Sequence, residues 1–194
     1  MIDIIINKNI KFLQKYGIGM ETEDDKDVYR YGLQIIYSYI ISISVILSIS
    51  VLFNRFYETA IMLFVFAVLQ VFNGGYHAGT KLKCQLLTVM GSMAGNIWAS
   101  IILNHSIFMI ISAVILSVVI IITGPVENKN HPVSKKTYKR SKRIVRIIAL
   151  LNFFATITLV IINKNIEASV IVSTLFLYVI SLSSAKIKTS PDNT

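Results

Sequence analysis

A histidine and the chain's only cysteine stand seven residues apart, in the segment Asn73-Gly74-Gly75-Tyr76-His77-Ala78-Gly79-Thr80-Lys81-Leu82-Lys83-Cys84. An imidazole that removes the proton of a cysteine thiol produces a thiolate, the nucleophile of cysteine catalysis. In one continuous helix His77 and Cys84 would share a face but lie roughly 10 Å apart along the axis, too far for proton transfer. Three glycines, Gly74, Gly75 and Gly79, permit a break in the helix that brings the two side chains together. We expect the chain to bend at Gly75.

The surroundings of Cys84 favour its ionised form. We expect Cys84 in or just before the first turn of a helix, where unpaired backbone N–H groups stabilise a thiolate. Lys81, Lys83 and a protonated His77 add positive charge nearby. Because no carboxylate stands close in sequence, we predict a His–Cys dyad rather than a triad. Amide side chains are the candidates for orienting the imidazole or binding an oxyanion: Asn73 and Gln85 for either role, and Asn96 for the imidazole.

Two other interpretations of the same side chains are open. A lone cysteine is commonly a small buried hydrophobe, and a lone histidine is commonly a hydrogen-bonded core residue. A metal site would need a third ligand; His105 falls on the opposite side of the membrane in the topology below, and His131 lies among cations that repel a divalent ion. We therefore expect neither a metal nor a cofactor.

The elements that must position this pair are transmembrane helices. Hydrophobic residues make up 54% of the 194 residues and charged residues 15%, and the mean hydropathy is +0.66, which excludes one water-soluble domain. At about 1.5 Å per residue, a 30 Å hydrocarbon core needs roughly 20 helical residues. The runs free of charged residues then predict an all-α polytopic membrane protein with six spans, the second notably short: 33–53, 59–72, 85–103, 107–123, 145–162 and 167–185.

We predict one membrane domain over residues 1–194, made of an N-terminal segment (1–30), a bundle (31–185) and a tail (186–194). The N-terminal segment begins with apolar residues at helical spacing, typical of a short amphipathic helix that lies in the membrane interface or, equally, packs on the spans. The acidic residues of 21–27 are expected to form a solvated linker.

The basic residues orient the bundle. If six helices alternate across the bilayer, 17 of the 19 Lys and Arg residues fall on one side, and only Arg55 and Lys164 on the other. Because basic residues of short loops are retained in the cytoplasm, both termini and the His77–Cys84 segment are expected there. This topology also accounts for the net charge of +9, so we expect no nucleic-acid partner.

Two further features suggest binding surfaces. Residues 129–146, expected to form a loop and the start of the fifth span, carry eight cations, more than topology requires, and anionic lipid headgroups are their simplest partner. Gly91 and Gly95 form a GxxxG pattern, which typically lets one membrane helix pack closely on another.

These residues resemble a known family, the accessory gene regulator B (AgrB) membrane endopeptidases of Gram-positive bacteria. The first matching segment is Gly74-Gly75-Tyr76-His77-Ala78, followed by Cys84 and Thr88. The second is Gly124-Pro125-Val126-Glu127-Asn128-Lys129-Asn130-His131-Pro132-Val133, ahead of the basic cluster. Chain length and the pattern of spans are similar too. Gln70 departs from the family, which often has a basic residue at that position.

The resemblance implies a cysteine endopeptidase of the bacterial cell membrane, with His77 and Cys84 as its catalytic pair. Its substrate would be an AgrD-like propeptide, cleaved through an enzyme thioester and closed to a thiolactone or lactone quorum-sensing peptide. A homodimer is a further implied partner. The resemblance also suggests that an acidic tail of the propeptide binds Lys135, Lys136, Lys139 and Arg140. The alternative function is a multi-pass transporter or exporter of a small peptide, without covalent chemistry.

Overall fold

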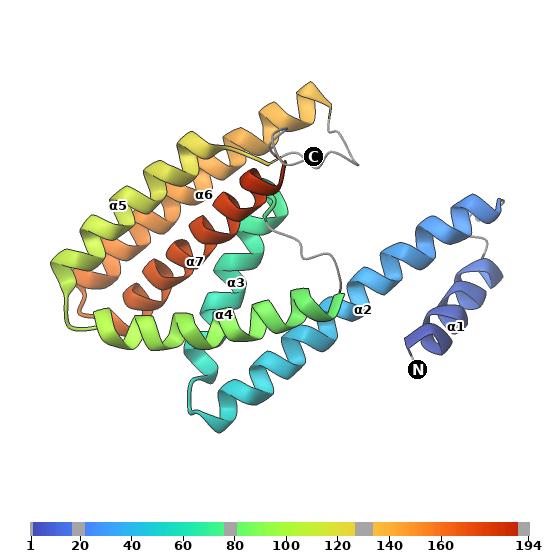
Figure 1. Ribbon diagram of the computed structural model, residues 1–194, viewed down its shortest axis with the longest axis horizontal. Coiled ribbons are helices and arrows are strands. Elements are labelled where there is room, and N and C mark those ends of the chain that lie inside the picture. The colour runs from blue at the N-terminus through green and yellow to red at the C-terminus, as the bar shows by residue number, and fades with distance from the viewer. Residues whose placement is uncertain (1, 17–21, 76–80, 127–133, 190–194) are drawn as a thin grey trace. The chain divides into compact units, whose positions relative to one another are not determined.

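The computed structural model describes residues 2–16, 22–75, 81–126 and 134–189, and the regular structure in these ranges is entirely helical (Figure 1). Six of the helices found there are long and apolar enough to cross a membrane, α2 to α7, which confirms the predicted all-α polytopic architecture. The chain separates into two compact units, Met1–Ile46 and Leu47–Thr194. The helices are α1 (Ile2–Lys15), α2 (Glu23–Leu52), α3 (Phe56–Asn73), α4 (Lys81–Ile102), α5 (Ser106–Thr123), α6 (Lys135–Ile161) and α7 (Asn165–Thr189).

Helix α2 begins ten residues before the predicted first span, so the interpretation of the acidic segment as a linker is wrong from Glu23 onward. Thr22 and Asp25 form a reciprocal cap: the Thr22 hydroxyl accepts from the Asp25 backbone N–H at 3.1 Å, and the Asp25 carboxylate accepts from the Thr22 N–H at 3.2 Å. Carboxylates in a first turn also complement the positive end of the helix dipole. The acidic residues therefore start a helix.

Helix α1 is present and packs on the first half of α2. Ile6 and Ile10 are buried against Leu33 and Tyr37, and the Asn9 amide donates a hydrogen bond to the Tyr37 hydroxyl. The Ile6 face thus packs on the first span, as one of the two predicted arrangements requires, and a position of α1 in the membrane interface stays a prediction.

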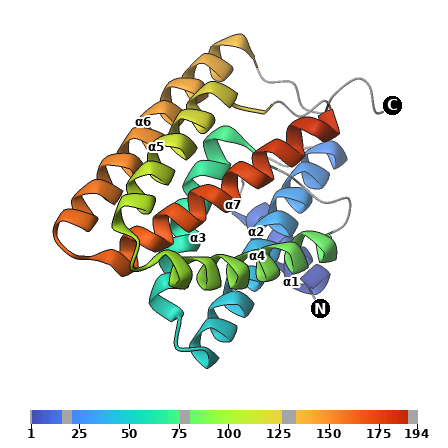
Figure 2. The ribbon, with the colours of Figure 1, turned by 60° about the vertical axis from the view of Figure 1, so that its left-hand side comes forward.

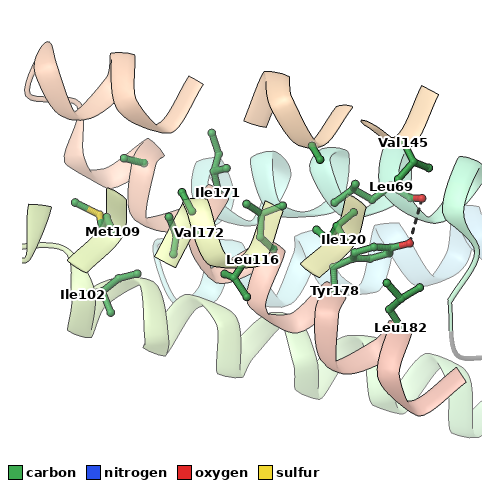
Figure 3. Packing of buried hydrophobic residues seen from close by; sticks show 14 residues of the cluster. Leu69, Ile102, Met109, Leu116, Ile120, Val145, Ile171, Val172, Tyr178 and Leu182 are labelled. Carbon is green, nitrogen blue, oxygen red and sulfur yellow. Dashed lines mark hydrogen bonds between the residues drawn. The ribbon is translucent and has the colours of Figure 1, made fainter. Parts of the chain in front are cut away.

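The second unit is built around α7, which packs against α3, α4, α5 and α6 (Figure 2). Every residue from Ala168 to Leu175 is buried, including three hydroxyl side chains. The hydroxyls of Ser169 and Thr174 bond carbonyls of their own helix, and small residues with such hydroxyls allow close approach of neighbouring helices. Figure 3 shows the apolar cluster that joins these helices, with members from α3, α4, α5, α6 and α7: Leu69, Ile102, Met109, Leu116, Ile120, Val145, Ile171, Val172, Tyr178 and Leu182.

The two glycines of the GxxxG pattern differ in their surroundings. A Cβ atom on Gly95 would meet Leu177 Cδ1 at 2.6 Å and Met62 Cε at 2.8 Å, whereas a Cβ on Gly91 would meet nothing within 4 Å. Gly95 thus lets α4 approach α3 and α7 within one chain, as expected for close helix packing. A homodimer would have only Gly91 of this pattern available.

These surroundings predict opposite outcomes for the same substitution. Gly95→Leu should lower the thermal unfolding midpoint of the detergent-solubilised protein markedly, because overpacking a filled contact costs about 1–3 kcal/mol or more. Gly91→Leu is the matched control and should unfold within a few degrees of the wild type. Equal midpoints for the two variants would contradict the packing described for Gly95.

Candidate active site

Cys84 lies at the end of the first turn of α4, which begins at Lys81. Its backbone is described and its side chain is not. His77 and Gly79 belong to residues 76–80, which lie outside the described residues. The distance between the imidazole and the thiol therefore stays a prediction. The described residues on both sides of residues 76–80 form the scaffold of the site.

Helix α3 ends at Asn73, so α3 and α4 do not form one continuous helix. Gly74 caps the helix with φ +73° and ψ −166°, and its N–H donates to the Gln70 carbonyl at 2.9 Å. A φ in this range favours glycine, since a Cβ atom would clash with the backbone. The pivot is thus Gly74 rather than Gly75, because only Gly74 of the two has a positive φ.

Two hydrogen bonds from distant parts of the chain hold this turn. The Val126 N–H donates to the Asn73 carbonyl at 3.0 Å, and the Tyr178 hydroxyl donates to the Gly74 carbonyl at 2.7 Å. Tyr178 also lies 3.4 Å from the Leu69 carbonyl oxygen, the contact drawn in Figure 3. The end of α3, the residues that follow α5 and a buried side chain of α7 therefore meet immediately before the segment that carries His77.

The first bond joins the two segments that carry the family resemblance. Val126 follows Gly124, which caps α5 with φ +63°, as Gly74 caps α3. A Cβ atom on Gly74 would lie 3.1 Å from the Val126 carbonyl oxygen. Both helices thus end in a glycine of similar conformation, and the two chain segments lie close together at Gly74 and Val126.

Asn73 has the most unusual environment of the candidate amides. Its side chain is fully buried beside the Tyr178 hydroxyl, and neither its Oδ1 nor its Nδ2 atom makes a hydrogen bond of good geometry in the part of the chain that the structure describes. A buried amide without well-formed hydrogen bonds costs free energy, so Asn73 keeps hydrogen-bonding capacity at the edge of the site. Gln85 is half-buried next to Cys84.

The Nδ2 group of Asn96 is engaged in helix packing, whereas its buried Oδ1 atom has no partner among the described residues. Its amide donates to the Thr59 hydroxyl at 2.9 Å and to the Ser92 carbonyl at 3.0 Å, and so helps pack α4 on α3. It lies twelve residues from Cys84 along α4, which is about 18 Å of helix.

The basic segment is helical rather than a loop from Lys135 onward, which corrects the expectation for residues 129–146. Ser134 caps α6 by accepting from the Thr137 N–H at 3.2 Å. At 3.6 residues per turn the cations fall on one side, opposite buried Val145, and neither ion pair found among the described residues involves them. Six of them are exposed and form what we call the cationic face of α6: Lys135, Lys136, Lys139, Arg140, Arg143 and Arg146.

This cationic helix starts close to the second signature segment. A Cβ atom on Gly124 would lie 3.6 Å from the Tyr138 hydroxyl and 3.8 Å from Lys142 Cε. Within the described residues, no group of three His, Cys, Asp or Glu side chains could hold a metal ion.

Comparison with known proteins gives the family. The sequence profile of accessory gene regulator B (AgrB) matches residues 6–182, nearly the whole chain. The chain belongs to the AgrB family. Membership confirms the resemblance noted in the sequence, and with six apolar helices it supports a multi-pass membrane protein involved in processing a quorum-sensing propeptide.

Three relatives named for their likeness to AgrB align with most of the chain. One from Clostridium perfringens is 30% identical over 158 residues, 76% of this chain and 73% of its own length. A second C. perfringens protein is 26% identical over 172 residues, which cover 79% of this chain and 78% of its own length. The third, from Clostridium acetobutylicum, is 24% identical over 148 residues, which cover 76% of this chain and 70% of its own length. No solved structure matches the chain significantly.

Tyr178 is the residue of this site that sequence reasoning missed. It is the one tyrosine of the last predicted span, 167–185. A tyrosine buried in a membrane bundle needs a partner for its hydroxyl, and that requirement is the signal that could have drawn attention to it.

Proposed function

We propose that this AgrB family member is a membrane cysteine endopeptidase that cleaves the C-terminal tail from an AgrD-like propeptide and promotes its cyclisation. The observation that carries the proposal is the AgrB match itself, which spans both His77 and Cys84. The end of α3 at Asn73 and the start of α4 at Lys81 support it, because His77 precedes the helix that carries Cys84, and one continuous helix with its roughly 10 Å separation is then not required.

In the proposed reaction His77 takes the thiol proton of Cys84, and the thiolate sulfur attacks the scissile carbonyl carbon. The C–N bond then breaks, and the tail leaves as an amine that carries the proton from the imidazole. A thiol or hydroxyl of the remaining peptide attacks the thioester, gives up its proton and closes the ring, and Cys84 is released. Ring closure requires that water be kept from the acyl-enzyme and that the internal nucleophile be held close.

The helix start and the neighbouring amides supply supporting roles. Cys84 lies at the positive end of α4, which stabilises a thiolate. The buried amide of Asn73, which makes no hydrogen bond of good geometry within the described residues, is suited to donate to the oxyanion or to orient the imidazole, and Gln85 is the second candidate for those roles. We place the site and both termini on the cytoplasmic side, on the distribution of basic residues.

The thioester provides the direct test. When the purified protein is mixed with a propeptide that lacks the cyclising nucleophile, we expect an acyl adduct on Cys84 that adds the mass of the truncated peptide acid less one water molecule. Hydroxylamine should remove it, and mass spectrometry of the intact protein measures both. A transporter of small peptides would form no adduct and would retain peptide flux after Cys84→Ala.

The cationic face of α6 is proposed to bind the acidic tail of the propeptide. Replacing Lys135, Lys136 and Lys139 together by glutamate should weaken propeptide binding at least tenfold, because the exposed cations become like charges of the tail. Raised salt should weaken binding to the wild type, and basic residues placed in the tail should partly restore binding to the variant. Titration of a labelled propeptide measures the dissociation constant in each case.

The same triple reversal in α1, at Lys8, Lys11 and Lys15, is the matched control and should leave propeptide binding within twofold of the wild type. Unchanged binding by the α6 variant, with its topology verified, would leave that face to anionic lipid headgroups.

A further inference from the structure

We propose that Tyr178 is a positioning residue of the peptidase site, acting through its hydrogen bond to the Gly74 carbonyl. The inference rests on the proposed function and adds to it a residue of α7 that is distant in sequence from both His77 and Cys84.

The Tyr178 hydrogen bond satisfies a carbonyl group at the end of a helix. The last carbonyls of a helix have no partner within the helix, and Gly74 follows directly after the last residue of α3. The Tyr178 hydroxyl, at 2.7 Å, supplies a donor to the Gly74 carbonyl. Its ring is fully buried and packs edge-on against Phe66 at 5.6 Å, so the hydroxyl is held in place.

A phenylalanine would fill the same space without the polar atom. Burying a hydroxyl is unfavourable unless it is bonded, so apolar packing alone does not explain a tyrosine here. The hydroxyl is directed to the end of α3, toward both the Gly74 and the Leu69 carbonyls. Its role is thus tied to the turn rather than to the core in general.

The turn determines the direction in which the chain leaves α3. Asn73 is held by the Val126 N–H and Gly74 by the Tyr178 hydroxyl, so two consecutive carbonyls are fixed from two different parts of the chain. His77 follows Gly74 by three residues. A misplacement of a catalytic group by about 1 Å can lower the reaction rate a hundredfold. Loss of one of these two hydrogen bonds should therefore displace His77 and slow the reaction.

Tyr178→Phe tests the proposal, since it removes the hydroxyl and keeps the ring. With the protein in nanodiscs, we expect kcat for propeptide cleavage to fall tenfold to a hundredfold, with KM within threefold of the wild type. Tyr37→Phe is the matched control: it also removes a hydroxyl that makes a hydrogen bond, but within the other unit, and should keep kcat within twofold.

The pH dependence of Cys84 alkylation separates positioning from a general structural effect. Cys84 is the only thiol, so iodoacetamide incorporation reports its thiolate directly. Tyr178→Phe should lower the rate at pH 7 relative to that at pH 9.5 severalfold, as His77→Ala does, whereas a merely loosened structure changes both rates alike. Lys81 and Lys83, the other charges near Cys84, are common to all variants.

The outcomes are distinct. If His77→Ala changes the alkylation profile and Tyr178→Phe does not, the dyad stands and the positioning role is overturned. A fall in kcat with an unchanged profile and a lower unfolding midpoint likewise overturns it in favour of a structural role. If His77→Ala leaves the profile unaltered, the dyad itself is wrong, and the role of Tyr178 is lost with it.

Discussion

Cys84→Ala should abolish propeptide cleavage while the protein still inserts into the membrane at the wild-type level. The thiolate is the proposed nucleophile, and no other cysteine in the chain can replace it. Insertion is governed by the apolar spans, and Cys84 precedes the apolar window of α4, which begins at Gln85. Co-expression with the propeptide, followed by mass spectrometry of the products and membrane fractionation, measures both effects.

Two companion variants sharpen this result. Cys84→Ser should lose all or nearly all activity, because a hydroxyl ionises far above neutral pH and needs stronger base assistance than one histidine gives. His77→Ala should also abolish cleavage. Robust cleavage by Cys84→Ala would remove the nucleophile assignment and with it the endopeptidase function.

Gly74→Ala should reduce cleavage by tenfold or more, through the backbone rather than through a lost functional group. Alanine at φ +73° and ψ −166° is strained by about 1–3 kcal/mol, and its Cβ would lie 3.1 Å from the Val126 carbonyl oxygen. The turn is expected to relax by shifting the chain that leads to His77. Initial rates of propeptide cleavage by the variant and the wild type, compared at equal amounts of membrane-inserted protein, measure this reduction.

Gly91→Ala is the control, since Gly91 lies inside α4 with nothing within 4 Å of an added Cβ. It should keep full activity and gain slight stability, because alanine is the better helix former. If Gly74→Ala also retained wild-type rates, the conformation of this turn would not matter for the reaction.

The six spans could be predicted from the sequence because charged residues are expelled from a hydrocarbon core, which leaves long charge-free runs. The interruption between the second and third of them followed from clustered glycines. The same reasoning identified His77 and Cys84 as candidates, since reactive residue types and their spacing are local properties of the chain.

The starts of α2 and α6 could not be predicted in this way. Acidic residues suit a first helical turn, and lysine and arginine are good helix formers, so charge excludes a segment from the membrane without excluding it from a helix. The helical period then places six cations of α6 on one face, an arrangement that a loop would not impose.

The anchoring of the turn was decided by the tertiary structure alone. Tyr178 and Gly74 are 104 residues apart, and Val126 is 53 residues from Asn73, so no local pattern links them. The choice of Gly74 over Gly75 for the positive φ depends on where α3 ends against α7 and against Val126, which follows α5. Sequence determines which segments enter the membrane and which residues are reactive, because those properties depend on local composition. The packing of helices that are distant in sequence decides which backbone groups form hydrogen bonds next to the reactive residues.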